Sequence, residues 1–406
     1  MEALRIAVTG GGTGGHTFPA LAVIREIRWG GAADSASLRT PDFMYLGSAD
    51  GFEHWAAERE GVPFASVRTG KLRRGMRRRD LITRENIVDT IRVFKGISDA
   101  VRVLRRFKPQ VLFATGGYVS GPGVVAAHIF RIPILVHEPT PQLGLANRIS
   151  ARLATQIALS FPNSLSTLSP RLRKKATVTG NPVRAEVFSG DAVRAREMFE
   201  FNGANAELPV VYFTGGVQGA QSINRAVEES LSEILRHCCV IHQCGSRQGT
   251  ETADLGRLQA VRANLSPELQ GRYYVTPLIH SEEIGDVFAL ADLIVGRSGA
   301  GTANEVAALG KPAIWVPLVP TGGDEQRRIA NEFAKVEAAL VIPDPQLTPN
   351  LLVKSIASIL QDENRRRRMA VSARSLHIPS AAQRLSEIVL TLAGIDPAAR
   401  IAGYGG

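Results

Sequence analysis

Two segments of the chain, one in each half of its 406 residues, have the form of a strand, a glycine-rich turn and a helix. In the first, apolar residues 4–8 lead into the turn 10–15 and then into a stretch with helical apolar spacing at 19–27. In the second, residues 209–213 lead into the turn 215–220 and another helix. Such a turn points backbone N–H groups and the positive end of a helix dipole at one place above the sheet. That place suits a phosphate or a diphosphate.

The order of apolar and helical segments predicts an α/β protein. A chain of 406 residues is long for one core, so we expect two domains. Short apolar runs alternate with helical patterns throughout, as doubly wound parallel sheets require. The breaker residues of 179–184 place the connection between the domains there. We predict strands at residues 4–8, 43–46, 111–114, 132–136, 156–159, 210–213, 239–243, 273–276, 293–295, 313–316 and 340–342.

Composition describes a soluble globular protein. Hydrophobic residues make up 44% of the chain and charged residues 21%. No stretch approaches the roughly 18 consecutive apolar residues that span a bilayer. The apolar start at 4–8 leads into glycines rather than into the longer apolar region and cleavage site of a signal peptide. We therefore expect the chain to remain in the cytoplasm.

The cysteines favour a reduced core over a metal site. Cys238, Cys239 and Cys244 are too few for a disulfide framework, and with His237 and His242 they resemble a metal-binding cluster. Residues from Cys239 onward have the pattern of a buried strand, however, in which neighbouring side chains point to opposite faces and cannot converge on one ion. We predict no metal site.

The net charge of +10 and the pI of 9.9 favour anionic partners, which include nucleic acid, anionic lipid and diphosphate substrates. The densest basic block is 71–79, and an apolar and basic run follows it at 81–107. Basic residues beside exposed apolar ones are typical of a membrane-surface contact. A solvated loop followed by a core helix has the same pattern, so both interpretations stay open.

The first glycine turn fits neither standard nucleotide motif. Gly10, Gly12 and Gly15 satisfy G-x-G-x-x-G, but the second predicted strand ends in Gly47 without the acidic residue that binds a ribose. A phosphate-binding P-loop needs lysine after the last glycine, and this chain has His16 there. Both a dehydrogenase and a nucleotide hydrolase are therefore disfavoured.

His16 is a candidate general base. It stands at the start of a predicted helix, where the positive end of the dipole favours a neutral imidazole. A neutral imidazole can accept a proton from a hydroxyl group. The alternative is a histidine that only hydrogen-bonds the loop; we favour the base.

A third segment, 296–305, follows the predicted strand 293–295. Ser298 is placed to cap the next helix, and Glu305 lies one or two turns into it. A carboxylate there can accept two hydrogen bonds from a ribose diol, although a glutamate that only favours the helix start has the same position. The chain has no Asp-x-Asp triplet, a common metal–diphosphate clamp. Charge neutralisation then falls to helix N-termini and arginine.

A longer set of segments carries a resemblance: 11–16, 116–122, 137–138, 146–147, 179–184, 215–220 and 297–300, with Glu305. In order and spacing, this set resembles the bacterial MurG glycosyltransferase family. The resemblance covers roughly residues 4–393. That family transfers N-acetylglucosamine from its UDP donor to the 4-hydroxyl of lipid I, an undecaprenyl diphosphate muramoyl-pentapeptide, and so makes lipid II for peptidoglycan.

The resemblance implies a GT-B fold, in which two Rossmann-like α/β domains with parallel sheets face a cleft. Residues 1–182 would form the acceptor domain and face the membrane, with a last helix at 378–395 packing back on it. Residues 183–377 would bind the UDP-sugar. The implied partners are UDP-N-acetylglucosamine, lipid I and the inner face of the cytoplasmic membrane, without nucleic acid and without a cofactor.

The resemblance also assigns residues. His16 would be the catalytic base, and no residue would bind a metal. Acceptor-binding residues would be Gly11, Gly12, Gly116, Gly117 and Tyr118. Substrate-binding residues would be Thr13, Gly14, Gly15, Asn147, Arg184, Val217, Gln218, Gly219, Ala220, Glu305 and Gln326.

The chain departs from the family pattern at three places. Val217 replaces a usual serine, Pro139-Thr140 replaces Gln-Asn, and Ile329-Ala330 replaces Asn-Ala. The alternatives are a transferase for another lipid or natural-product acceptor and a UDP-sugar epimerase. A nonenzymatic binder of anionic surfaces would explain the charge but leaves Glu305 and both glycine turns without a role.

Overall fold

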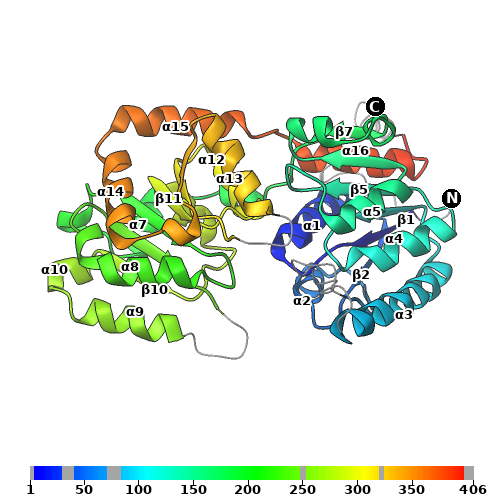
Figure 1. The fold of residues 1–406 in the computed structure, drawn as a ribbon, viewed down its shortest axis with the longest axis horizontal. Coiled ribbons are helices and arrows are strands. Elements are labelled where there is room, and N and C mark those ends of the chain that lie inside the picture. The colour runs from blue at the N-terminus through cyan, green and yellow to red at the C-terminus, as the bar shows by residue number, and fades with distance from the viewer. Residues whose placement is uncertain (1–3, 30–40, 71–83, 247–252, 320–323, 397–406) are drawn as a thin grey trace. The chain divides into compact units, whose positions relative to one another are not determined.

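The computed structural model describes residues 4–29, 41–70, 84–246, 253–319 and 324–396. The chain forms two compact α/β units (Figure 1). Unit 1 is Met1–Val183 together with Ile378–Gly406, and unit 2 is Arg184–His377. The basic block 71–79, expected at a membrane surface or in a solvated loop, lies outside the described residues.

The sheet of unit 1 has seven parallel strands in the order β3-β2-β1-β4-β5-β6-β7. The first strand in sequence, β1, therefore lies between β2 and β4, and the chain continues outward on both sides of it. The strands are β1 (Arg5–Thr9), β2 (Asp42–Gly47), β3 (Phe64–Ser66), β4 (Val111–Ala114), β5 (Ile134–Glu138), β6 (Gln156–Leu159) and β7 (Ala176–Val178).

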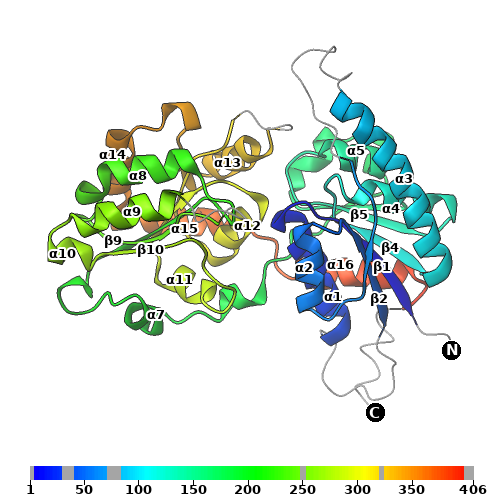
Figure 2. The same cartoon turned by 90° about the horizontal axis from the view of Figure 1, so that it is seen from below.

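Helices cover both faces of this sheet, because alternate strand residues point to opposite sides. Ile6 and Val8 pack with the helices α1 and α16 on one face, whereas Ala7 packs with α3, α4 and α5 on the other (Figure 2). The last helix thus contributes Leu385 and Val389 to the core of unit 1. The helices are α1 (Gly14–Trp29), α2 (Phe52–Arg59), α3 (Arg84–Phe107), α4 (Ser120–Ile129), α5 (Leu145–Leu153), α6 (Pro170–Arg173) and α16 (Ala381–Leu392).

The sheet of unit 2 has six parallel strands in the order β10-β9-β8-β11-β12-β13, so that β8 lies between β9 and β11. The strands are β8 (Val210–Thr214), β9 (Cys239–Gln243), β10 (Tyr273–Thr276), β11 (Leu293–Gly296), β12 (Ala313–Trp315) and β13 (Ala339–Val341). The helices are α7 (Ala192–Met198), α8 (Gln221–Ile234), α9 (Ala253–Ala263), α10 (Pro267–Gln270), α11 (Ile284–Leu290), α12 (Ala300–Leu309), α13 (Glu325–Lys335), α14 (Pro349–Leu360) and α15 (Glu363–Ser375).

The predicted parallel α/β architecture is confirmed, and each predicted strand is present with its ends within two residues of the prediction. Two edge strands, β3 and β7, were not predicted. The three cysteines are buried, as predicted, and the ring of His242 is hydrogen-bonded to Tyr273 and Asn224. Among the helices that the structure describes, none is both long and apolar enough to cross a membrane.

Candidate active site

In each unit, the predicted turns lie where the strand order changes direction. β1 pairs with β4, so the turns that follow these two strands are neighbours at one edge of the sheet. In unit 2, β8 pairs with β11, so the turns after β8 and β11 are also neighbours at one edge of the sheet. The connections from such a pair of strands run to opposite sides, which leaves a crevice at the carboxyl ends of the strands where ligands bind in open α/β sheets. The sheet topology therefore brings the predicted segments together within each unit.

The first glycine turn, residues 10–15, packs closely against the segment 116–118. Gly12 has φ +81°, and a Cβ there would lie 2.7 Å from the ring of Tyr118. Gly117 has φ +79°, and a Cβ there would lie 2.2 Å from the carbonyl oxygen of Gly11. The structure thus brings these predicted acceptor-binding residues into direct contact and requires glycine at both positions.

A buried carboxylate organises the first glycine turn. The side chain of Glu53 on α2 accepts hydrogen bonds from the backbone N–H of Gly12 at 2.9 Å and of Ser48 at 3.0 Å. The N–H of Gly11 donates to the carbonyl of Gly116 at 3.3 Å. Because α1 begins at Gly14, the first N–H groups of this helix have no partner within it. Donors for an anion are therefore concentrated at Gly14 and Gly15.

The ring of His16 is held in one tautomer. Its Nδ1 lies 2.8 Å from the carbonyl oxygen of Thr115, at the end of β4. A carbonyl oxygen only accepts, so Nδ1 carries the proton and Nε2 of the neutral ring keeps its lone pair. The Thr115 hydroxyl donates a hydrogen bond to the backbone carbonyl of His16 at 2.6 Å. Two hydrogen bonds therefore join His16 to Thr115. Nε2 of the half-buried imidazole can therefore act as a proton acceptor.

Glu138, the last residue of β5, anchors the loop that leads into α5. Its carboxylate accepts hydrogen bonds from the backbone and hydroxyl of Thr140, from the N–H of Gly144 and from the Nδ2 of Asn147, at 2.7–3.0 Å. Burial raises the pKa of Glu138, and these donors oppose the rise. Thr140, one of the departures from the family pattern, thus supplies two of the bonds.

Asn147 is itself buried, and its Nδ2 also donates to the carbonyl of His137 at 3.0 Å. A Cβ at Gly116 would lie 2.7 Å from this nitrogen. Within the described residues, the Oδ1 of Asn147 has no hydrogen-bond partner. Asn147 thus packs against Gly116, and its side-chain nitrogen already donates hydrogen bonds to His137 and Glu138.

The second glycine turn, residues 215–220, precedes α8. Gly219 has φ +74°, and a Cβ there would lie 2.1 Å from the carbonyl of Cys244. The N–H of Gly219 closes the turn on the carbonyl of Gly216 at 3.1 Å. Ala220 is the N-cap of α8 and has no side chain that could cap the helix. Val217, Gln218, Gly219 and Ala220 therefore frame a helix N-terminus whose first N–H groups lack partners within the helix.

Arg184 and Glu305 form a partly buried ion pair in unit 2. The Arg184 Nε lies 2.7 Å from Glu305 Oε1, and Nη2 lies 2.7 Å from the same oxygen. Burial raises the pKa of Glu305, whereas the charge of Arg184 acts against the rise. The arginine thus orients the carboxylate and favours its ionised form, which is the hydrogen-bond acceptor that a diol requires.

The prediction that Ser298 caps α12 is wrong. The N-cap is Gly299, and the Ser298 hydroxyl donates instead to the carbonyl of Gln326 at 2.7 Å. The Gln326 Oε1 accepts the backbone N–H of Leu318 at 2.9 Å. Ser298 precedes the helix by two residues, so its side chain is better placed to join β11 to the start of α13. The predicted residue Gln326 is therefore adjacent to the turn after β11.

Three residues with positioning roles were missed. Thr115 follows β4 directly and precedes two glycines, and Thr214, the last residue of β8, also precedes two glycines, so this position was a usable signal. Arg297 links the turns after β8 and β11, because it bonds to Asp344 and to the hydroxyl of Ser222 on α8. Glu53 gave no local signal, since its burial depends on contacts with the distant turn 10–15.

The predicted site residues are divided between the units. His16, the acceptor-binding set, Thr13, Gly14, Gly15 and Asn147 lie in unit 1. Arg184, Val217, Gln218, Gly219, Ala220, Glu305 and Gln326 lie in unit 2.

Comparison with known proteins gives consistent matches over both units. The model of the glycosyltransferase family 28 N-terminal domain matches residues 6–159, and that of the family 28 C-terminal domain matches residues 210–385. The crystal structure of Acinetobacter baumannii MurG has a TM-score of 0.69 and 25% identity, covering 96% of this chain and 99% of that chain. The two strand-turn-helix segments thus fall one in each matched domain.

Two bacterial proteins share the name UDP-N-acetylglucosamine–N-acetylmuramyl-(pentapeptide) pyrophosphoryl-undecaprenol N-acetylglucosamine transferase. The one from Clostridium perfringens (strain SM101 / Type A) is 34% identical over 360 residues, which are 88% of this chain and 91% of that protein. The one from Listeria monocytogenes serovar 1/2a (strain ATCC BAA-679 / EGD-e) is 33% identical over 390 residues, 96% of this chain and 99% of that protein. The similarity extends over nearly the whole chain.

Proposed function

Because the chain belongs to the MurG family within glycosyltransferase family 28, we propose that it transfers N-acetylglucosamine from UDP-N-acetylglucosamine to the 4-hydroxyl of lipid I and so forms lipid II. Lipid I is the undecaprenyl-pyrophosphoryl-linked N-acetylmuramyl pentapeptide that the relatives' name describes. No cofactor takes part in the proposed reaction.

The observation that carries the proposal is the contact between His16 Nδ1 and the Thr115 carbonyl. It leaves the lone pair of Nε2 to accept a proton from the acceptor hydroxyl, directly or through one water. The hydroxyl oxygen attacks C1 of the sugar, the bond from C1 to the UDP oxygen breaks, and UDP leaves with that electron pair. A single displacement of this kind inverts the configuration at C1.

The donor side of the reaction falls to unit 2. The first N–H groups of α8 and the backbone of the second glycine turn bind the diphosphate, and they stabilise the negative charge that grows as UDP leaves. Glu305 accepts hydrogen bonds from the ribose diol while Arg184 holds it. Val217 contributes backbone groups where a serine would add a hydroxyl. Gln326, whose carbonyl accepts the Ser298 hydroxyl, is the residue that we propose to contact the sugar.

The acceptor side falls to unit 1. The amides of Gly14 and Gly15 at the start of α1 bind the diphosphate of the acceptor, next to His16. Tyr118 packs on Gly12, and burial together with the charge of Glu53 raises the pKa of its hydroxyl. Tyr118 therefore stays a neutral hydrogen-bond donor at neutral pH.

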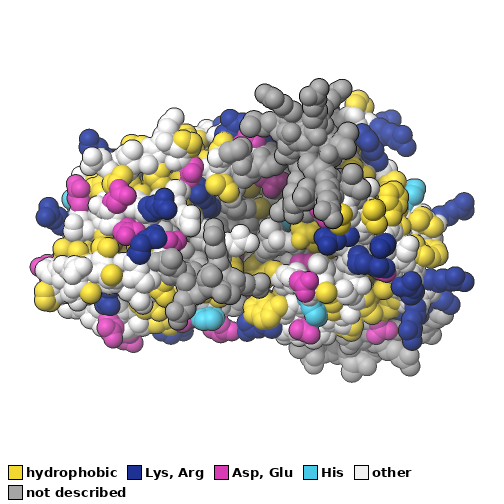
Figure 3. All heavy atoms as spheres, turned by 60° about the horizontal axis from the view of Figure 1, so that its bottom comes forward, with side chains coloured by type: hydrophobic (Ala, Val, Ile, Leu, Met, Phe, Trp, Pro, Cys, Tyr) yellow, Lys and Arg dark blue, Asp and Glu magenta, His cyan; other side chains and the backbone are white. Residues whose placement is uncertain are grey.

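We further propose that the protein acts in the cytoplasm, on the inner face of the cell membrane, with α3 as the contact. Val88, Ile91 and Phe94 are exposed on this helix at a spacing of three residues, and Phe94 is 67% exposed. Arg92 and Lys95 are exposed beside them. In Figure 3, hydrophobic and basic side chains lie next to one another on the face of unit 1 in view. Such a surface binds anionic lipid. A lipid-linked acceptor is anchored in the membrane, so the protein has to bind the acceptor at the membrane surface.

The test is the release of UDP from UDP-N-acetylglucosamine, measured with and without a short-chain analogue of the lipid-linked acceptor, in buffer with a chelator. The proposal expects release that depends on the acceptor. No release in either condition would contradict it, and release without the acceptor would favour hydrolysis or another reaction of the donor.

A further inference from the structure

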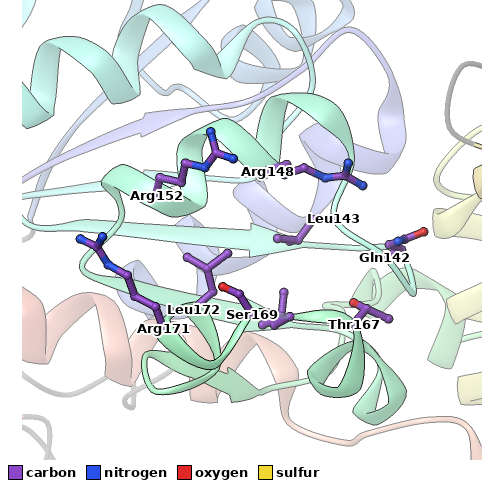
Figure 4. Close-up of a pocket in the computed structure, with 9 residues that line it drawn as sticks. Gln142, Leu143, Arg148, Arg152, Thr167, Ser169, Arg171 and Leu172 are labelled. Atoms are coloured by element: carbon purple, nitrogen blue, oxygen red, sulfur yellow. The ribbon is translucent and has the colours of Figure 1, made fainter.

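Unit 1 contains a cavity of about 530 Å³ between α5 and the segment that runs from a 3₁₀ helix (Pro162–Thr167) into α6. Leu143, Leu168 and Leu172 form its apolar part. Arg148 and Arg152 extend from α5 on one side, and Arg171 extends from α6 on the other (Figure 4). We call it the basic cavity. None of its lining residues belongs to the glycine turns or to the proposed site.

The three arginines of the basic cavity are uncompensated. Within the described part of the chain, none of their guanidinium groups has a hydrogen bond or an ion pair, and no residue that lines the cavity is acidic. Ser169 adds a hydroxyl at the rim. All three arginines are exposed, so water solvates their guanidinium groups in the free protein and leaves them accessible to an anion. Guanidinium groups bind carboxylates in a paired geometry, which matches a ligand with carboxylates.

A single loop links the cavity wall to a neighbour of the proposed base. Glu138 lies near enough to His16 for an electrostatic interaction. Thr140 and Gly144 both bond to that carboxylate, and the two residues enclose Gln142 and Leu143 of the cavity wall. One anchored loop therefore connects the site of proton transfer with the mouth of the basic cavity.

The proposed acceptor carries a peptide with free carboxylates next to its reacting hydroxyl group. In an N-acetylmuramyl group, the peptide is attached through the oxygen at C3, next to the reacting 4-hydroxyl. A pentapeptide spans at most about 17 Å when extended. When the 4-hydroxyl meets His16, the peptide therefore starts beside the loop that Glu138 anchors, and this loop leads to the basic cavity.

We propose that the basic cavity binds the carboxylate-bearing peptide of the acceptor. The inference rests on the proposed function and extends it: the peptide, as well as the sugar and diphosphate, is recognised. Arg148, Arg152 and Arg171 pair with its carboxylates, and the three leucines contact its apolar side chains.

The test compares two acceptors with the same short lipid in a non-ionic detergent, one with free peptide carboxylates and one with these converted to carboxamides. The wild-type protein should have a KM about tenfold lower for the carboxylate acceptor, because exposed ion pairs are individually weak and several of them together give a ratio of that size. The combined variant Arg148→Gln, Arg152→Gln, Arg171→Gln should lose this preference while keeping its KM for UDP-N-acetylglucosamine.

Lys174→Gln is the matched control, since Lys174 is an exposed cation close in sequence to α6 that does not line the cavity. It should keep the preference. Equal KM values for both acceptors in the wild type, or an unchanged ratio in the triple variant, would overturn the inference while transfer itself confirms the proposed function. A triple variant that loses only its binding to anionic vesicles would assign the cavity to a lipid headgroup and overturn the peptide assignment. Absence of transfer to either acceptor would overturn both.

Discussion

At the scale of single residues, backbone carbonyls decide what the site can do. The Thr115 carbonyl selects the tautomer of His16, so the base depends on a contact with a strand almost a hundred positions away in sequence. The position of His16 after a glycine turn was evident from the sequence, but its tautomer was not, because the carbonyl that sets it comes from the neighbouring strand. Glu53 was missed for the same reason.

Replacing His16 tests the base directly. His16→Ala should lower turnover by roughly 10²-fold or more, because no other group takes the proton, and should leave UDP affinity nearly unchanged. Steady-state kinetics and UDP titration measure the two effects. His54→Ala is a matched control, since its Nδ1 also lies 2.8 Å from a carbonyl, that of Ala49, and His54 has no role in the proposed reaction. Near-normal turnover in His16→Ala would refute the assignment.

Glu305 is expected to act in donor binding rather than in the chemical step. Glu305→Gln keeps the shape but replaces one acceptor oxygen by a donor, so the KM for UDP-N-acetylglucosamine should rise by about tenfold with little change in kcat. The affinity ratio between UDP and 2′-deoxy-UDP should fall in this variant. If the variant still prefers UDP as strongly as the wild type, Glu305 does not bind the ribose.

At the scale of elements, the buried parallel strands were predictable, whereas the two edge strands of unit 1 were not. Strands such as β4 and β8 are buried at every position, and continuous apolar runs mark them in the sequence. β3 and β7 are three residues long, pair on one side only and include exposed positions, so no apolar run distinguishes them. Ser298 shows the same limit at a helix start, since its partner Gln326 belongs to another helix.

The sequence of α3 fits both a membrane-surface helix and a core helix, and the described part of the helix has features of both. Ala100 and Leu104 are buried in the core of unit 1, whereas Val88, Ile91 and Phe94 are exposed. The double variant Ile91→Ser, Phe94→Ser should weaken binding to anionic vesicles by about tenfold or more, because burying one large apolar side chain contributes about 1.5–3 kcal/mol. Vesicle cosedimentation measures this.

Val371→Ser provides the control for the vesicle experiment. Val371 lies on α15 of unit 2 and is 73% exposed, so the change removes a comparable apolar group from another helix. Its vesicle binding should equal that of the wild type. Equal losses in the α3 and α15 variants would show that α3 is not the specific contact.

At the scale of the whole molecule, each unit contains a fully buried histidine that cannot ionise readily. Burial lowers the pKa of His137 to about 4 in unit 1 and that of His242 to about 3 in unit 2. Between these values and the ordinary 6.5, the unfolded chain binds protons that the folded chain does not. The free energy of unfolding of each unit should therefore fall as the pH decreases from about 6.5 to 5, by up to about 1.4 kcal/mol per pH unit.

Urea unfolding at several pH values measures this dependence. His242→Gln should flatten the pH dependence of unit 2 and leave that of unit 1 unchanged, since the removed group belongs to one core only. The same slope for unit 2 in the variant and the wild type would contradict the assignment to His242.

The structure of the product tests the central claim most directly. The protein is incubated with UDP-N-acetylglucosamine and the lipid-linked acceptor, and the new glycosidic bond is identified by NMR spectroscopy. An inverting transfer by His16 predicts a β bond from N-acetylglucosamine to O4 of the muramoyl sugar. An α bond, a bond to another oxygen, or an epimerised donor without any disaccharide would contradict it.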